Sequence, residues 1–163
     1  SEGTGESTGE KSKSFELVTF GSSFNVCDRQ LALQEVSRIL KPKGWFACLW
    51  NHRSLADPVQ SEIEAIIKKR VPGYGYGSRR EDQTPIIDGS GLFGDVLHLD
   101  STILHRQTVD DCVEAWRSHA TLARQAGSEF GNVISEIDVF LRNLDQERIN
   151  IPYSTNVWIA QLR

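Results

Sequence analysis

Residues 38–53 read RILKPKGWFACLWNHR and contain the end of a helix, a tight turn and a buried strand. Pro42 and Gly44 predict the turn, because proline cannot continue a helix and glycine commonly follows its last residue. Residues 45–50 are almost wholly apolar, as in a strand buried on both faces of a sheet. Polar residues 51–53 follow directly. This order is typical of a cofactor-binding α/β domain, which presents its chemistry at the carboxyl ends of the strands.

The preceding segment completes a strand–helix–strand unit. Residues 15–20, FELVTF, are β-branched and aromatic and predict a strand. Asp28 is suited to cap a helix, and an apolar stripe at helical spacing runs from Leu33 to Leu40. We therefore expect two parallel strands within residues 15–50, joined by a right-handed crossover.

The remaining elements are predicted from caps and periodicity. Asp57 followed by Pro58 and Gln60 predicts the start of a second helix. Thr108 with Asp111 forms a capping box that opens another. The other expected elements are a surface excursion over residues 73–91, a strand over 96–105, an amphipathic helix over 130–144 and a final strand over 156–162.

Composition excludes several classes of protein. The chain has 163 residues, 39% of them hydrophobic, and a formal charge of −4, which fits one globular domain and gives no basic face for nucleic acid. No apolar run reaches the roughly 18 residues of a membrane span, so we expect a cytoplasmic protein without membrane contact. The three cysteines are widely spaced and lack metal-ligand spacing, which predicts buried thiols and no metal site.

The sequence predicts one flexible segment and one folded segment. Residues 1–14, SEGTGESTGEKSKS, are rich in Gly, Ser and Glu and predict a flexible polar arm. Residues 15–163 are expected to form a single α/β unit. The glycines of residues 73–77, GYGYG, follow a helix instead of a strand, so they do not predict a phosphate-binding loop.

His52 has two interpretations that the residues leave open. A histidine just beyond a strand's carboxyl end is placed to act as a general base near neutral pH. The alternative is that Asn51 and His52 only hold the following turn by hydrogen bonds. His119 lies near the end of the helix that Thr108 opens. It is either a base as well or only a cation in the last turn that complements the helix dipole.

The segments SFELVTFGSSFNVCD and LALQEVSRILKPKGWFACLWN resemble the second half of class I S-adenosylmethionine-dependent methyltransferases. The resemblance implies a partial Rossmann-like sheet with strands in the order 4-5-7-6, the last strand antiparallel, and flanking helices. It implies S-adenosylmethionine as cofactor and a small-molecule methyl acceptor. Two features depart from the family: the glycine-rich cofactor loop is missing, and the family's "FHW" loop reads Phe24-Asn25-Val26.

The resemblance also assigns roles to residues. On the cofactor side it implies Glu6, Ser22, Ser23, Phe24 and Asn25. On the substrate side it implies Asn51, Arg53, Arg117 and Tyr153, with Arg79 and Arg80 as further arginines suited to an anionic substrate. His52 or His119 is the expected base.

Without the glycine loop, the resemblance implies a truncated methyltransferase that is not catalytic alone, because methyl transfer depends on positioning. The apolar strand over residues 15–20 then becomes an unprotected edge, which predicts a homodimer paired through that edge. The alternative function is a non-catalytic dimeric module that binds a partner or ligand.

Overall fold

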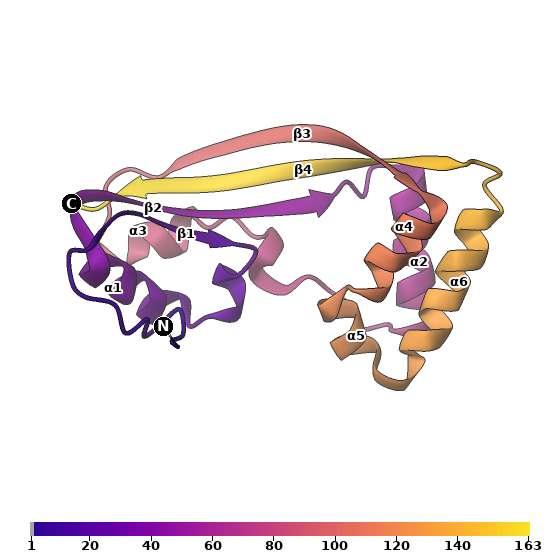
Figure 1. Ribbon diagram of the computed structural model, residues 1–163, viewed down its shortest axis with the longest axis horizontal. Helices are drawn as coiled ribbons and strands as arrows, with labels where there is room; N and C mark the ends of the chain where they lie inside the picture. Colours follow the sequence, from indigo (N-terminus) through magenta and orange to yellow (C-terminus); the bar gives the residue numbers. More distant parts are fainter. Residues whose placement is uncertain (1) are drawn as a thin grey trace. The chain divides into compact units, whose positions relative to one another are not determined.

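Four strands form one sheet, in the order β1-β2-β4-β3, in the computed structural model, which describes residues 2–163. The strands are β1 (Phe15–Gly21), β2 (Leu40–Arg53), β3 (Leu97–Thr108) and β4 (Arg148–Gln161). β1 and β2 are parallel, whereas the arrowheads of β2 and β4 point in opposite directions (Figure 1). The order 4-5-7-6 with an antiparallel last strand is therefore confirmed.

Three of the helices begin at the caps that the sequence predicted. Asp28, Asp57 and Thr108 accept hydrogen bonds from the first-turn N–H groups of α1, α2 and α4. The helices are α1 (Arg29–Ile39), α2 (Pro58–Arg70), α3 (Thr84–Gly89), α4 (Val109–Arg117), α5 (Ala120–Ala126) and α6 (Phe130–Arg142), with 3-10 turns η1 (Phe24–Val26), η2 (Gly77–Arg80) and η3 (Gly127–Glu129). The short helices α3 and α5 were not predicted.

The predicted turn at residues 42–44 lies inside β2. Phe15 of β1 pairs with Leu40, but Leu17 pairs with Trp45, so β2 carries extra residues between the two pairs. Lys43 has a φ of 64°, which bends the strand back into register. Helix α1 consequently ends at Ile39 and the strand follows directly.

The chain folds into two compact units, where the sequence analysis expected one unit over residues 15–163. Among the described residues, unit 1 consists of residues 2–52, 77–101 and 155–163, and unit 2 of residues 53–76 and 102–154. Strands β2, β3 and β4 each contribute residues to both units. The strands expected at residues 45–50 and 156–162 would lie in unit 1 alone, whereas the one expected at 96–105 already crosses the boundary.

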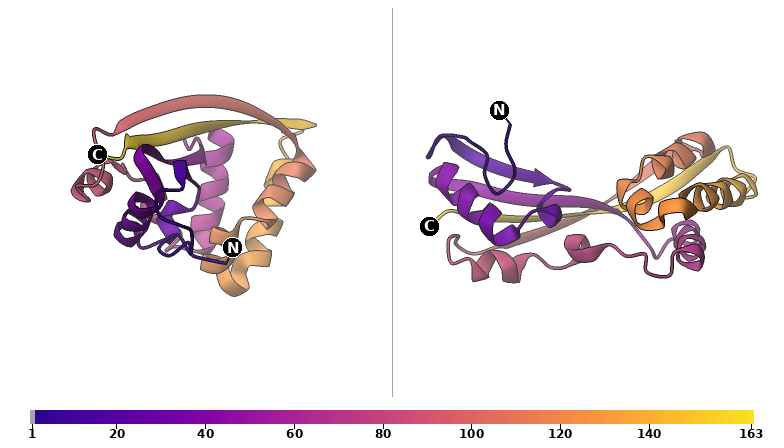
Figure 2. Two further views of the ribbon diagram at one scale, coloured as in Figure 1. Left: turned by 60° about the vertical axis from the view of Figure 1, so that its left-hand side comes forward. Right: turned by 90° about the horizontal axis from the view of Figure 1, so that it is seen from below.

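Unit 1 has helices on one face of its strands. Helices α1 and α3 lie on that face in both views of Figure 2, over an aromatic cluster in which the rings of Phe20, Phe24 and Phe46 are 5.4–6.0 Å apart. Leu17 and Trp45, paired across β1 and β2, keep 54% and 39% of their surface exposed. The sheet of unit 1 is thus buried on one face and open on the other among the described residues.

Unit 2 is a helical cluster built around the ends of the long strands. Helices α2, α4 and α5 each pack against α6. Its core includes Ile63, Trp116 and Ile137, with Ile149 and Ile151 contributed by β4. This separate core explains why the two parts form distinct compact units.

Residues 2–14, expected to be a flexible arm, make defined contacts with α1. The Glu35 carboxylate accepts a hydrogen bond from Thr8 N at 2.8 Å, and Arg38 Nη2 donates to the Glu10 carbonyl at 2.7 Å. A Cβ at Gly5 would lie only 2.6 Å from Cys27 Sγ, so glycine permits this close approach. The composition of this segment shows how few apolar side chains it has, but it does not show which hydrogen bonds its polar groups make.

Candidate functional site

Three segments of unit 1 meet at the carboxyl ends of β1 and β2. The loop after β1 contains Ser22 and η1; Ser22 N donates to the Leu49 carbonyl of β2 at 2.8 Å. The turn η2 packs against η1. Ser22 has a φ of 54°, which is uncommon for a residue other than glycine and marks a tight departure from the strand. In sheets of this kind, ligands bind at such strand ends.

The η1 loop presents backbone and hydroxyl groups, and its larger side chains are engaged. Phe24 is fully buried among the aromatic rings of the core, so its side chain cannot contact a cofactor as the resemblance implied. Asn25 Oδ1 accepts a hydrogen bond from Trp50 Nε1 at 3.0 Å, which holds the loop against β2. Ser22 is exposed and Ser23 half-buried, so their hydroxyls remain the predicted cofactor-side groups of this loop.

Glu6 lies beside the same loop, and its carboxylate is already hydrogen-bonded to the protein backbone. Its Oε1 accepts a hydrogen bond from Asp28 N at 2.7 Å, at the start of α1. That backbone donor is the main reason why the pKa of Glu6 is lowered. Glu6 therefore supplies a carboxylate next to η1, and any contact with a cofactor must share it with Asp28.

His52 is buried at the end of β2, with 6% of its surface exposed. Its Nε2 lies 2.9 Å from the Arg79 carbonyl, which can only accept, so Nε2 carries the proton and Nδ1 the lone pair. Burial, with the charges of Arg80 and Arg79, lowers the pKa of His52 to about 4. At neutral pH the ring is uncharged and a weak base, which favours the structural interpretation over the catalytic one.

Asn51 precedes His52 and is exposed. Its Oδ1 accepts a hydrogen bond from Thr155 Oγ1 at 2.6 Å, which links the last residues of β2 to the middle of β4. A ligand at these strand ends would meet Asn51 through its remaining amide donors.

Three further predicted substrate-side residues, Arg53, Arg117 and Tyr153, belong to unit 2, whereas Arg79 and Arg80 belong to unit 1. The Arg53 guanidinium lies 4.3 Å from the centre of the Trp116 ring and 5.8 Å from that of Tyr153, a cation–π arrangement with both rings. Arg53 and Tyr153 are thus brought together, around a tryptophan that the sequence analysis did not place with them. Arg117 is exposed and pairs with Glu114 at 3.4 Å.

His119 caps a helix. Its Nδ1 accepts a hydrogen bond from Leu122 N at 3.1 Å, at the start of α5, and its ring lies 5.2 Å from that of Trp116. With the Nδ1 lone pair used in this way, His119 could accept a proton only by giving up the cap. Of the two predicted bases, His52 belongs to unit 1 and His119 to unit 2.

Sequence reasoning missed the buried anchor of the segment after Tyr76. Gln83 is fully buried and its Nε2 donates to the carbonyls of Ser78 and Glu81 at 2.9 and 2.7 Å. Asp82 Oδ1 accepts from Trp158 Nε1 at 2.9 Å. The Gly-, Arg- and Asp-rich composition predicted a surface excursion, and no local pattern distinguishes a glutamine that is solvated from one that organises a turn.

Other chemistries receive no support from the described residues. Burial raises the pKa of Cys48 to about 12 and also raises those of Cys112 and Cys27, so the thiols stay protonated at neutral pH. Within residues 2–163, no group of three or more His, Cys, Asp or Glu side chains is arranged to hold a metal ion. The same range contains no helix of the length and hydropathy needed to cross a membrane.

Comparison with known proteins gives consistent matches. Residues 1–48 match the family model of the methyltransferase domain. An uncharacterized methyltransferase from Schizosaccharomyces pombe is 23% identical over 159 residues; the match covers 85% of this chain but 57% of that protein. The chain therefore spans little more than half the length of this curated relative.

Two solved structures have a similar fold. A protein described as a type II methyltransferase from Anaeromyxobacter dehalogenans aligns with a TM-score of 0.57 and 15% identity, covering 99% of this chain and 69% of that one. The YcgJ protein from Bacillus subtilis aligns with a TM-score of 0.51 and 18% identity, with the same coverages.

Proposed function

We propose that this chain, a relative of the class I methyltransferases by its sequence match and its fold, contributes part of a site that transfers a methyl group from S-adenosylmethionine to a small molecule. The observation that carries the proposal is the meeting of η1, the end of β2 and η2 at the carboxyl ends of two parallel strands. This is where an α/β sheet of this order places its ligand.

In this proposal the residues of unit 1 position the cofactor and the acceptor, and none of them removes a proton from the acceptor. Ser22, Ser23 and the Glu6 carboxylate face the cofactor, while Asn51 faces the acceptor. His52 keeps the strand end and η2 together through Arg79. The imidazole of His52 is neutral and its Nε2 proton is engaged, so we assign His52 to positioning. Without a base, the site suits an acceptor whose nucleophile reacts in its neutral form.

We further propose that these residues do not catalyse methyl transfer by themselves. Among residues 2–163, no glycine-rich loop follows a strand and opens a helix, which is the arrangement that positions such a cofactor. Binding of S-adenosylmethionine to the 163-residue chain is therefore expected to be weak.

Isothermal titration of S-adenosylmethionine into the folded chain tests this. We expect no saturable heat up to millimolar ligand. A chimera in which the N-terminal part of the S. pombe relative precedes residue 1 is expected to bind at micromolar concentration, and Asn25→Ala is expected to weaken that binding because it releases η1 from Trp50. Asn132→Ala, in α6 of unit 2, is the control. A chimera that folds but binds no cofactor would refute the methyltransferase proposal.

The alternative function, a dimeric module without catalysis, has one observation in its favour. β1 is the outermost strand of the sheet, and Leu17 and Trp45 next to that edge are exposed. Such a surface suits association with a second copy or another protein. Micromolar binding of S-adenosylmethionine by the chain itself would argue against this alternative.

A further inference from the structure

A groove of about 500 Å³ runs between α2 and α6 on the surface of unit 2. Arg70, the last residue of α2, donates hydrogen bonds to Glu129, just before α6, and to Glu136 within it. The end of α2 therefore lies beside the first half of α6, and the two helices run antiparallel. From this end the groove extends to Glu62 on α2 and Asn143 on α6, a length of about 12 to 16 Å at a helical rise of about 1.5 Å per residue.

The middle of the groove is apolar. Ile66 and Phe140 line it and are partly buried against the core of unit 2. Val139 also lines it and keeps 61% of its surface exposed. The Ser135 hydroxyl donates to the Gly131 carbonyl of its own helix at 2.9 Å, so it does not require a partner in the groove. An occupant that covers Val139 would remove apolar surface from water, which favours binding.

The charges at the Arg70 end of the groove balance one another. Arg70 donates to the carboxylates of both Glu129 and Glu136. Hydrogen bonds from Arg70, followed by the charges of Arg70 and of Lys69, lower the pKa of Glu136. Two cations and two carboxylates thus lie together at this end, and an occupant need not supply a charge there.

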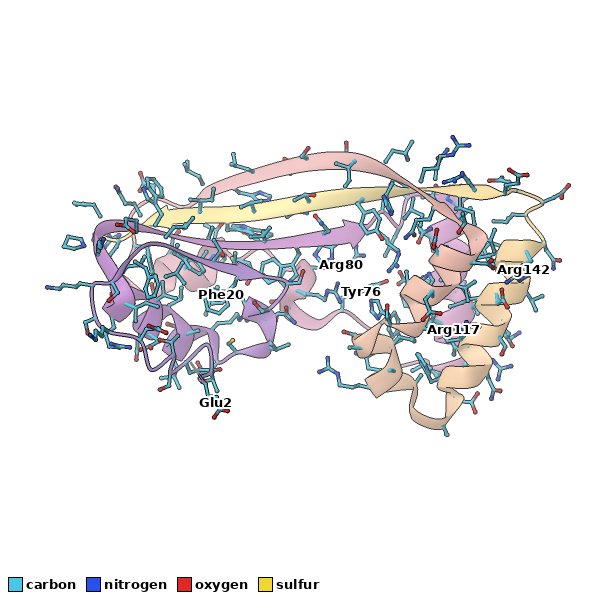
Figure 3. All side chains as sticks on the ribbon, in the orientation of Figure 1. Glu2, Phe20, Tyr76, Arg80, Arg117 and Arg142 are labelled. Carbon is cyan, nitrogen blue, oxygen red and sulfur yellow. The ribbon has the colours of Figure 1, made fainter. Side chains whose placement is uncertain are left out.

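Glu62 gives the other end of the groove a negative charge that is not balanced. It is exposed, and it belongs to none of the ion pairs that α2 and α6 form within residues 2–163. Arg142, the last residue of α6, is directed elsewhere: it donates to Asp110 of α4 at 2.8 Å and lies 2.7 Å from Asp138. Figure 3 shows Arg142 where α6 lies next to α4. The end at Glu62 is therefore suited to a cation.

The shape of the groove favours an elongated occupant. Pockets for small molecules are concave and bury most of their ligand, whereas Asn132, Val139 and Asn143 are exposed along this groove. A third helix can pack its ridge of side chains into the groove between two others. The length of the groove corresponds to about 8 to 11 residues of helix, which is enough for apolar side chains at i, i+4 and i+7.

We propose that the groove between α2 and α6 binds a cationic amphipathic helix of another protein. The apolar face of that helix covers Ile66, Val139 and Phe140, and a Lys or Arg near its end lies beside Glu62. A second copy of the chain fits less well, because the lining of the groove has two carboxylates and one guanidinium, and the chain itself has a net charge of −4. The inference goes beyond the proposed function and involves no residue of unit 1.

The test uses a stapled, fluorescent helical peptide of about 14 residues, with Leu at i, i+4 and i+7 and Lys at both ends. A matched peptide has Glu in place of every Lys. Fluorescence anisotropy at constant ionic strength measures the affinity of the 163-residue chain for each. We expect saturable binding of the Lys peptide, about tenfold weaker binding of the Glu peptide, and NMR shifts confined to the amides of residues 62–70 and 132–143.

Variants separate the contribution of charge from that of apolar surface. Glu62→Lys should abolish or reverse the preference for the Lys peptide, whereas Glu147→Lys, at an exposed position of unit 2 outside the groove, should retain it. Val139→Ser should weaken binding about fivefold through the loss of apolar contact. Leu104→Ser, which alters another exposed apolar position of unit 2, should bind as the unchanged chain does.

Three results would overturn the inference: no saturable binding of the Lys peptide, a preference between the peptides that Glu62→Lys leaves unchanged, or NMR shifts outside the two helices. A dimer that dissociates in Val139→Lys would also overturn it, because the groove would then be an interface between copies. None of these measurements involves S-adenosylmethionine, so their outcome is independent of the methyltransferase proposal.

Discussion

The protonation of His52 couples the folding of unit 1 to pH. In an unfolded chain a histidine has a pKa of about 6.5, whereas burial and two arginines lower the pKa of His52 to about 4. Between these values the unfolded chain binds more protons, so the stabilisation from a neutral His52 is complete above pH 6.5 and is lost as the pH falls toward 4. The free energy of unfolding should fall by up to about 3 kcal/mol over this window.

Urea unfolding at about pH 4 and about pH 7 measures this coupling, since the two values span the window. His52→Gln retains an amide that can donate to the Arg79 carbonyl but does not titrate, so the difference between the two pH values should shrink. His105→Gln, at an exposed position of unit 2, should leave it unchanged. An identical pH difference in His52→Gln and in the unchanged chain would show that His52 is not the titrating group.

Glu35 is one of the residues of α1 that hold residues 2–14. It is 8% exposed, and hydrogen bonds from Arg38 first, and from Thr8, lower its pKa to about 2. Glu35→Ala should release residues 2–14 without unfolding the sheet, so trypsin should cleave after Lys11 and Lys13 several times faster. Glu62→Ala, at an exposed position of α2, is the control. Unchanged cleavage in Glu35→Ala would mean that other contacts hold the segment.

At the scale of the element, α2 depends on a cap that its sequence predicts. Asp57 Oδ1 accepts a hydrogen bond from Gln60 N at 3.0 Å, and Pro58 occupies the first helical position. Asp57→Ala should lower the free energy of unfolding by about 1 kcal/mol, and Asp57→Asn, which keeps an accepting oxygen, should recover most of it. Chemical denaturation monitored by circular dichroism measures both variants. Equal losses in the two would indicate a contribution of the Asp57 charge instead of the cap.

Caps and apolar stripes predicted the longer elements because their signals are local. Helices α1, α2 and α4 begin where a side-chain acceptor was expected. Helices α3 and α5 have six and seven residues, too few for an amphipathic stripe to stand out. β4 begins at Arg148 and contains Pro152, which was expected to precede the strand.

The sequence predicted the part of the candidate site that follows from the positions of the strand ends. The loop of Ser22 to Asn25 and the pair Asn51 and His52 do lie at the carboxyl ends of parallel strands. The contact between His52 and the Arg79 carbonyl joins residues 27 positions apart and depends on the path of a loop. The Phe24 side chain is buried, so only its backbone is left for the predicted cofactor side. A motif gives a residue's place in the chain but not the direction of its side chain.

At the scale of the whole molecule, β1 leaves one edge of the sheet unpaired among the described residues. An exposed strand edge tends to pair with another, and a two-fold axis through the middle of β1 would join two copies by the same residues. Antiparallel pairing about Val18 would bring Leu17 of one copy opposite Thr19 of the other on the open face of the sheet. The exposed Leu17 and Trp45 would then be partly covered.

We therefore expect a dimer, with twice the monomer mass of 18.3 kDa, in light scattering at increasing protein concentration. Leu17→Lys should shift the equilibrium toward monomer, because the two lysines would lie near each other across the axis at a cost in desolvation and repulsion. Val139→Lys places the same charge on an exposed apolar position of α6 in unit 2 and should not affect the mass. A mass of 18.3 kDa at every concentration would exclude pairing through β1, and dissociation of the dimer by Val139→Lys alone would move the interface to unit 2. If only Leu17→Lys dissociates the dimer, the apolar edge of β1 determines assembly. That edge is already visible in the sequence FELVTF.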